Sequence, residues 1–232
     1  MSAIDVSRAQ EGDNGMGDIV RALSALSTPA ISDALDRLGI AGQAADIYPI
    51  DRQCRLAGRA YTVLYQPIDV MGGTVGDYIE EVPRGDVVVL DNSGRLDATV
   101  WGDILTMVAH RQGLGGTAIN GICRDSSRAF DVGYPLFSRG HWMRTGKDRV
   151  KVAGQQVPVV LGNVRVRPGD VLIGDADGVV VVPAEREQEV LDVAAEIERA
   201  EEVIRREVGR GTSLREARRQ LGYHALQTPR DT

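Results

Sequence analysis

The sequence predicts one domain of the mixed α/β class. A chain of 232 residues can be held by one hydrophobic core, which remains workable up to roughly 250 residues. An apolar run at 87–90, a helix-like segment at 103–112 and a second apolar run at 117–123 follow one another. This succession is typical of a crossover between parallel strands. No stretch has the composition of a linker, so we expect a single domain.

The N-terminal part is expected to begin with a polar, acidic and flexible arm over 1–17. A helix is expected over 18–38, with its main portion starting at Thr28-Pro29, because threonine is a good N-cap and proline is tolerated in the first turn. The elements predicted next are a strand over 56–70, a short helix over 75–81 and a buried strand over 87–90.

The centre of the chain is predicted to place polar residues at a sheet edge. A helix over 103–112 is followed by glycines that end it and by a buried strand over 117–123. Arg124-Asp125 comes directly after this strand. The carboxyl edge of parallel strands is where α/β proteins usually bind their ligands.

The second half is dominated by short strands, with a hairpin predicted at Asp177-Gly178. The predicted strands are 150–152, 157–161, 164–166, 171–173 and 179–182. A long helix is expected over 184–208, and a final helix opens at Ser213 with Glu216 three residues on, as in a capping box. We therefore place an α/β domain at 18–183 and C-terminal helices at 184–232, packed on the domain or on a neighbouring subunit.

The composition of the chain argues against nucleic acid and membranes as binding partners. The net charge of −6 disfavours binding to nucleic acid. Cys54 and Cys123 have neither CxxC spacing nor the density of a disulfide scaffold. The N-terminus has no apolar signal core, and no window reaches the roughly 18 apolar residues of a membrane span. We expect a cytoplasmic protein with no nucleic-acid or membrane partner.

Asp103 is the first candidate for chemistry. It opens the 103–112 helix, where an aspartate commonly serves only as a cap or a dipole partner. In the functional interpretation, the N–H groups of Ile104 and Leu105 receive a substrate carboxylate, as helix N-termini do for anions. Asp103 then faces the same pocket and holds a metal-bound water. The substrate-binding candidates in this turn are Gly102, Ile104 and Leu105.

Arg124 and Asp125 are the second candidate pair. A surface ion pair is the simpler interpretation. Alternatively, both side chains project from the strand end into one crevice, where Asp125 binds a Mg²⁺-like ion and Arg124 binds the carboxylate of the substrate through two hydrogen bonds.

Other cofactor chemistry is disfavoured. The three histidines, His110, His141 and His224, lack the spacing of a zinc site. The glycines after 112 do not follow a strand, so no nucleotide site is expected. A Schiff-base lysine needs a desolvated position, whereas Lys147 and Lys151, the only lysines, lie in a polar segment. Cys123 is predicted to be a core residue.

The chain contains an aspartate, Asp103, that is separated by twenty residues from the pair Arg124-Asp125. This pattern resembles the diagnostic motif of a known protein family. The family comprises the class II pyruvate aldolases that act on 4-hydroxy-4-methyl-2-oxoglutarate and their relative RraA, a regulator of ribonuclease E activity. The resemblance extends over about residues 20–205. The segments that carry it are 27–35, 58–63, 85–91, 101–103, 135–140, 166–170 and 175–183. One departure is Asn120-Gly121, where the family often has Asp-Gly.

The resemblance implies a fold, an assembly and a site. The fold is an α/β/β sandwich of the swivelling, phosphohistidine-domain-like type, assembled as homotrimers or hexamers with active sites between subunits. Asp125 is expected to ligate Mg²⁺ or Mn²⁺, Asp103 to reach the metal through water, and Arg124 to contact a 2-oxo acid. A glutamate from the C-terminal helix of a neighbouring chain completes the family's site, and Glu198 and Glu201 are candidates.

The leading hypothesis is therefore metal-dependent cleavage of a 4-hydroxy-2-oxo acid to pyruvate and a carbonyl product, with oxaloacetate decarboxylation as a side activity. A non-catalytic, protein-binding regulator of a ribonuclease is the alternative. A metal-dependent lyase acting on a 2-oxo acid derived from a sugar acid also stays open.

Overall fold

The computed structural model describes residues 17–68 and 75–220 of the chain. The predicted arm at 1–17 therefore lies almost entirely outside the described residues, as do the last two residues of the strand predicted over 56–70. A mixed sheet forms the centre, in the order β1-β11-β10-β3-β4-β5-β6-β2, with β7 also paired to β3. These strands are Gln43–Ala44 (β1), Tyr48–Pro49 (β2), Leu56–Pro67 (β3), Val87–Asp91 (β4), Gly116–Cys123 (β5), Leu136–His141 (β6), Val150–Gln155 (β7), Val171–Asp175 (β10) and Gly178–Val182 (β11).

The parallel part of the sheet confirms the predicted crossover. Strands β3, β4, β5 and β6 run parallel to one another. Helix α3 (Asp103–Gln112) connects β4 to β5, and α4 (Ser126–Asp131) connects β5 to β6. The carboxyl ends of β4 and β5 therefore lie at one edge of the sheet, with the start of each helix beside them.

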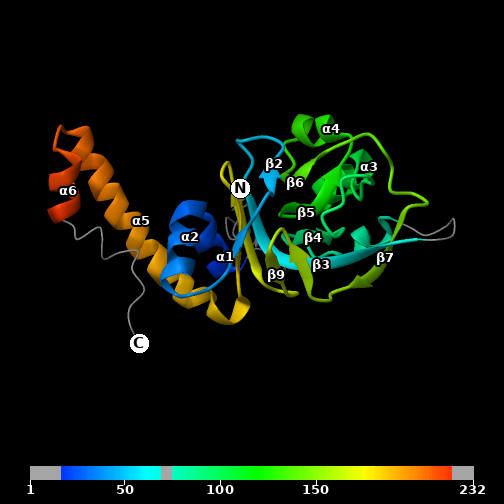
Figure 1. Ribbon diagram of the computed structural model, residues 1–232, viewed down its shortest axis with the longest axis horizontal. Coiled ribbons are helices and arrows are strands. Elements are labelled where there is room, and N and C mark those ends of the chain that lie inside the picture. The colour runs from blue at the N-terminus through cyan, green and yellow to red at the C-terminus, as the bar shows by residue number, and fades with distance from the viewer. Residues whose placement is uncertain (1–16, 69–74, 221–232) are drawn as a thin grey trace, which may run out of the picture.

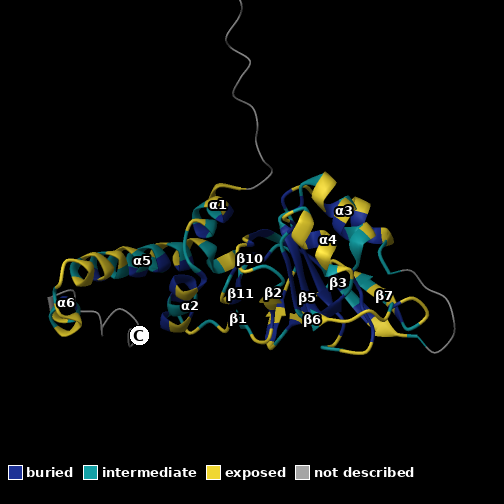
Figure 2. Cartoon of the chain, turned by 90° about the horizontal axis from the view of Figure 1, so that it is seen from above, coloured by how far each residue is buried: buried dark blue, intermediate teal, exposed yellow. Residues whose placement is uncertain are grey.

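Three apolar clusters hold the layers together. One lies between the parallel strands and the layer of α3, α4 and the 3₁₀ helix η1 (Asp77–Glu81). The second lies between the sheet and the hairpin of β8 (Val159–Leu161) and β9 (Val164–Val166). The third joins β10 and β11 to the helices α1 (Asp18–Ser24), α2 (Thr28–Arg37) and α5 (Glu187–Gly209). Figure 2 shows the central strands as buried and the outer faces of α3 and α4 as exposed.

The C-terminal helices extend away from the sheet. A 3₁₀ turn η2 (Ala184–Arg186) leads into α5 (Glu187–Gly209), and α6 (Leu214–Gln220) folds back on its far end. The first half of α5 packs on α1 and α2, whereas its second half projects beyond them (Figure 1). At the start of α6, Ser213 Oγ accepts the N–H of Glu216 at 3.3 Å, which is one of the two hydrogen bonds of the predicted capping box.

The single helix predicted over 18–38 is wrong. Two helices occupy this region, α1 (Asp18–Ser24) and α2 (Thr28–Arg37). Ser27 begins α2 by accepting the N–H of Ala30 at 3.3 Å, and Pro29 has no N–H with which to continue the preceding helix. The short helix predicted over 75–81 is the 3₁₀ helix η1, which covers Asp77–Glu81.

Candidate active site

Two segments distant in sequence meet at the carboxyl edge of the sheet. Thr99 pairs with Ile122 at the end of β5, and the N–H of Val100 bonds to the carbonyl of Ile122. The N–H of Arg124 then donates to the carbonyl of Trp101 at 2.9 Å. This alignment brings the start of α3 next to Arg124 and Asp125, as the sequence predicted for residues at strand ends.

Gly102 is the point of contact between the two motifs. A Cβ atom at this position would lie 2.9 Å from Asp125 Oδ2 and 3.4 Å from Arg124 Nε. Arg124 and Asp125 themselves form an ion pair of 3.2 Å, with both side chains about two-fifths exposed. One cluster is therefore formed by Arg124, Asp125 and the turn at Gly102. Arg124 and Asp125 do form an ion pair, as the simpler interpretation expected, and this pair is part of the cluster.

Asp125 adopts a left-handed backbone conformation, with φ 53° and ψ 33°. It occupies the N-cap position of α4, but its side chain makes no capping hydrogen bond. Aspartate tolerates this conformation better than most residues. Its carboxylate is therefore directed to Arg124 and Gly102 and is not used to hold α4.

Asp103 lies at the first position of α3, after Gly102 as N-cap. Its Oδ1 atom accepts the N–H of Ile104 at 2.9 Å, so its carboxylate folds over the helix N-terminus. An anion at this end is stabilised by the helix dipole. The N–H of Ile104, one of the two groups predicted to receive a substrate carboxylate, therefore donates to Asp103.

A pocket of about 670 Å³ opens next to this cluster. It is lined by all four residues of the Gly102–Leu105 turn and by Arg124. Asp77 and Glu80 of η1 form part of its wall, and Lys147 lies at its edge. Ligand pockets commonly have volumes of 300–1,000 Å³, so this one can accommodate a molecule larger than pyruvate.

Buried hydrogen bonds fix the turn that carries Asp103. The indole N–H of Trp101 donates to Thr106 Oγ1 at 2.9 Å, and this hydroxyl donates to the carbonyl of Gly102 at 3.0 Å. The Trp101 ring stacks on Tyr134 with centroids 6.1 Å apart. Both rings are almost fully buried. The turn is therefore anchored to the core.

The η1 wall of the pocket is also anchored. The hydroxyl of the buried Tyr65 donates to the carbonyl of Val75 and contacts the hydroxyl of Tyr78 at 3.4 Å. Burial raises the pKa of both phenols well above the ordinary value of 10, so each stays neutral. Neutral hydroxyl groups can serve as donors here, and they hold Val75 and η1 against β3.

The donor set suits a hard cation better than zinc. Among the described residues, no group of three or more His, Cys, Asp or Glu side chains could hold a metal ion. Mg²⁺ is commonly bound by only one or two protein carboxylates, with waters and substrate oxygens completing its octahedron. Asp125 approaches Gly102 and Asp103 follows it in the chain, so two carboxylate residues lie beside this turn. His224 lies outside the described residues.

The glutamates predicted to come from the C-terminal helix do not join this cluster within the chain. Glu198 accepts hydrogen bonds from Ser27 Oγ at 2.8 Å and from Arg205 at 2.6 Å. Glu201 pairs with Arg205 at 3.3 Å. Helix α5 lies at the opposite end of the molecule from α3 (Figure 1).

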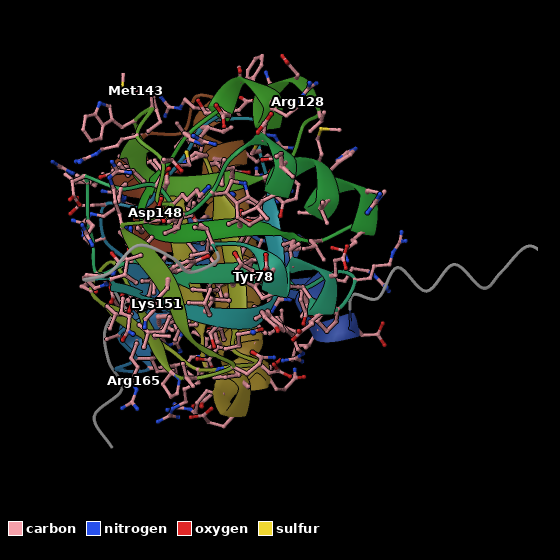
Figure 3. The ribbon with its side chains drawn as sticks, turned by 90° about the vertical axis from the view of Figure 1, so that its right-hand side faces the viewer. Tyr78, Arg128, Met143, Asp148, Lys151 and Arg165 are labelled. Carbon is pink, nitrogen blue, oxygen red and sulfur yellow. The ribbon has the colours of Figure 1, made fainter. Side chains whose placement is uncertain are left out.

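Lys147 lines the pocket, a position that the sequence did not predict for it. The polar segment that contains it loops back over Thr99, and the exposed Lys147 reaches the pocket edge. Figure 3 looks onto this side of the molecule, where the neighbouring Asp148 and Tyr78 of η1 are labelled. Lys147 is exposed, as expected of a residue in a polar segment.

Comparison with known proteins identifies the family. A model of the RraA-like family, described as Aldolase/RraA, matches residues 28–181, which include the whole cluster and most of the sheet. The chain belongs to this family.

Two curated relatives are similar over most of the chain. Protein DlpA of Legionella pneumophila is 37% identical over 211 residues, covering 90% of this chain, which spans only 34% of that protein's length. A protein of Halalkalibacterium halodurans named "Putative 4-hydroxy-4-methyl-2-oxoglutarate aldolase" is 32% identical over 177 residues, covering 76% of this chain and 82% of the relative.

Solved structures share the mixed α/β fold. An uncharacterized protein from Pseudomonas syringae aligns with a TM-score of 0.82 at 39% identity, covering 88% of this chain and 98% of that one. RraAS2 of Streptomyces coelicolor, described as an unusual member of the RNase ES inhibitor RraA protein family, aligns with a TM-score of 0.75 at 31% identity, covering 82% and 97%. In the described part of this chain, no helix is both long and apolar enough to cross a membrane.

Proposed function

We propose that the protein is a divalent-metal-dependent lyase that cleaves a 4-hydroxy-2-oxo acid, such as 4-hydroxy-4-methyl-2-oxoglutarate, to pyruvate and a carbonyl product. The observation that carries the proposal is the cluster of Asp103, Arg124 and Asp125 around Gly102, beside a pocket of about 670 Å³. The aldolase name of the Halalkalibacterium relative supports the same reaction class.

The roles of the residues follow from their chemistry. Arg124 lines the pocket and offers a planar fork of N–H donors to the substrate's C1 carboxylate. Asp103, at the pocket wall, accepts the proton of the 4-hydroxyl group as the bond between C3 and C4 breaks. The electron pair of that bond passes to the pyruvate half, which then takes up a proton at C3.

Asp125 would hold the Mg²⁺ or Mn²⁺ ion, and Asp103 would reach it through a water molecule. When bound, this ion supplies Lewis-acid stabilisation of the negative charge that develops on the pyruvate half. Asp125 remains next to Arg124, so the arginine is oriented by a carboxylate as well as by its backbone hydrogen bond to Trp101. Oxaloacetate decarboxylation develops charge on the same half of the molecule, and we propose it as a side activity.

The assembly that we propose is a homotrimer or hexamer of swivelling-type domains in which α5 of a neighbouring subunit reaches the pocket. Two features support it. Glu198 and Glu201 cannot join the cluster of their own chain, because α5 lies at the other end of the molecule (Figure 1). Ile104 and Met107 on α3 and Phe130 on α4 are more than half exposed, which suits a surface that another chain covers.

The test of this function is pyruvate release from oxaloacetate and from 4-hydroxy-4-methyl-2-oxoglutarate by chelator-stripped protein, with and without added Mg²⁺ or Mn²⁺. Release should return with metal and should be lost in Asp125→Asn, which removes the charge and keeps a side chain that tolerates positive φ. Asp46→Asn is the matched control, because Asp46 also has positive φ (60°) and pairs with one arginine. No release with any metal would remove the proposal.

The second candidate is a protein-binding regulator of a ribonuclease, favoured by the similarity to RraAS2. The two candidates differ in their dependence on Asp125. Ribonuclease inhibition that persists in Asp125→Asn, from a protein that releases no pyruvate, would establish the regulator.

A further inference from the structure

Lys147 is held at the pocket edge by a tightly packed loop. Thr145 pairs with Thr99, and a Cβ atom on Gly146 would lie 2.1 Å from the carbonyl oxygen of Thr99, so only glycine fits there. The N–H of Lys147 donates to Thr145 Oγ1 at 3.2 Å, and Arg149 donates to the carbonyls of Thr145 and Lys147 at 3.2 Å each. The backbone of Lys147 is therefore fixed relative to the segment that leads into Asp103.

The ammonium group of Lys147 has no acidic partner among the described residues. Asp77 and Glu80 line the same pocket, yet neither forms an ion pair with Lys147. Arg124, by contrast, is already paired with Asp125. Lys147 is thus an exposed cation with its charge available to a ligand.

Among the described residues that line the pocket, two are cationic. Arg124 lies beside the Gly102–Leu105 turn, and Lys147 lies on a different loop, which follows β6. Asp77 and Glu80 make the η1 wall unfavourable for an anion. A molecule with an anionic group at each end is best accommodated with one end at Arg124 and the other at Lys147.

We propose that Lys147 binds the distal carboxylate of the substrate and thereby selects dicarboxylic 2-oxo acids over monocarboxylic ones. This inference rests on the proposed lyase function and names a residue of the same site that determines its specificity. A flexible lysine suits the role, because its ammonium group offers three rotatable donors on a long stem and can follow carboxylates at slightly different distances from the 2-oxo group.

The test compares two substrates with the same pyruvate half. 4-Hydroxy-2-oxoglutarate carries a distal carboxylate, and 4-hydroxy-2-oxopentanoate carries a methyl group in its place. Lys147→Gln is assayed with both in the presence of Mg²⁺ or Mn²⁺. Lys151→Gln is the matched control, because Lys151 is the chain's other lysine and lies on β7, outside the pocket lining (Figure 3).

We expect Lys147→Gln to lower kcat/KM for the dicarboxylate about 10- to 100-fold, the usual effect of losing a charge-assisted hydrogen bond, and to leave the monocarboxylate within about twofold. Lys147→Arg should retain much of the wild-type kcat/KM for the dicarboxylate, and Lys151→Gln should change kcat/KM for neither substrate.

Three results would overturn the inference. An equal loss for both substrates would make Lys147 a structural residue or a partner of Asp77 or Glu80. No loss for either would leave it without a role in binding. A wild-type protein that cleaves neither substrate would remove the lyase function itself, and the inference with it, and this outcome is separable because it is seen before any variant is compared.

Discussion

Gly102 is required by what a side chain at this position would meet. Its φ of −152° and ψ of −168° are extended values open to any residue. Gly102→Ala places a Cβ atom 2.9 Å from Asp125 Oδ2 and should push the carboxylate out of place. We expect kcat/KM to fall at least about 10-fold, because small displacements of catalytic groups are costly, with little change in the thermal midpoint.

Gly209→Ala is the control for this change, because nothing lies within 4 Å of a Cβ atom at Gly209. Steady-state kinetics and a thermal melt decide the outcome. Full activity in Gly102→Ala would show that the close approach of Asp125 to this turn has no part in catalysis.

Arg124→Lys tests the proposed contact with the substrate carboxylate. Lysine keeps the charge but loses the planar fork, so a bidentate hydrogen bond becomes a single point contact. We expect KM for oxaloacetate to rise about 10- to 100-fold with a smaller change in kcat. Arg128→Lys serves as control, since Arg128 lies on α4 and outside the pocket lining. A fall in kcat alone would assign Arg124 to the chemical step.

At the residue scale, the sequence could predict the types of group in the site and not their contacts. Asp103, Arg124 and Asp125 could be found because carboxylates and a guanidinium at element ends are informative in themselves. The left-handed backbone of Asp125 and its contact with Gly102 could not be found, because both depend on how β5 aligns with the 99–101 segment. Lys147 was assigned to a polar segment for the same reason.

Among elements, the start of α3 depends on one hydroxyl. Thr106→Val keeps the shape of the side chain but leaves the buried indole N–H of Trp101 without its partner, whereas the carbonyl of Gly102 keeps its bond to the backbone N–H of Thr106. We expect the free energy of unfolding to fall by about 1–3 kcal/mol, as for other unpaired buried groups. Urea denaturation measures this loss.

Thr212→Val is the matched control, because the Thr212 hydroxyl makes only a long contact of 3.4 Å with Glu207 near the end of α5. Its effect should stay within about 0.5 kcal/mol. Equal stability of the two variants would mean that the turn is held by backbone packing alone.

Elements with a strong local pattern were predicted, and those formed by distant pairing were missed. The strands β4 and β5, helix α3 and the β10–β11 hairpin match their predictions, because their apolar runs and turn residues are local signals. Strand β6 was missed, since Leu136–His141 has few apolar residues and is held by β5 and β2 on either side. Helix α4 spans six residues, too few to show a helical period.

For the whole molecule, the proposed assembly makes the activity of one chain depend on α5 of another. In this assembly, a glutamate from α5 of one chain completes the active site of its neighbour. The glutamate that does so, Glu198 or Glu201, is expected to reduce activity when it is replaced by glutamine. Only Glu198→Gln should also lower the thermal midpoint, because Glu198 bonds to Ser27 at the start of α2. Mixing Asp125→Asn subunits with the less active glutamate variant, after mild dissociation, should recover activity that neither has alone. Absence of recovery in this mixture would mean that each chain works by itself.

The pH dependence of the stability of the whole fold should contain a contribution from Asp86, which precedes β4. Burial raises the pKa of Asp86 to about 6 from the ordinary 3.8, and Arg59 offsets this only in part because it forms a bidentate ion pair with Glu187. The folded protein thus holds this proton more tightly than the unfolded chain does. The stabilising effect is complete below about pH 4 and is lost as pH rises through about 6.

Asp86→Asn should therefore make the protein more stable at neutral pH and should flatten the stability profile between about pH 4 and pH 7. The measurement is the urea midpoint of wild type and variant across this range, because the difference between the two isolates Asp86 from other titrating carboxylates. The difference should grow from about pH 4 to about pH 6 and level off above 6, where the wild-type carboxylate is ionised in its half-buried position. A difference that is constant with pH would mean that Asp86 titrates alike in the folded and unfolded states, and that solvent reaches the turn between Pro83 and β4.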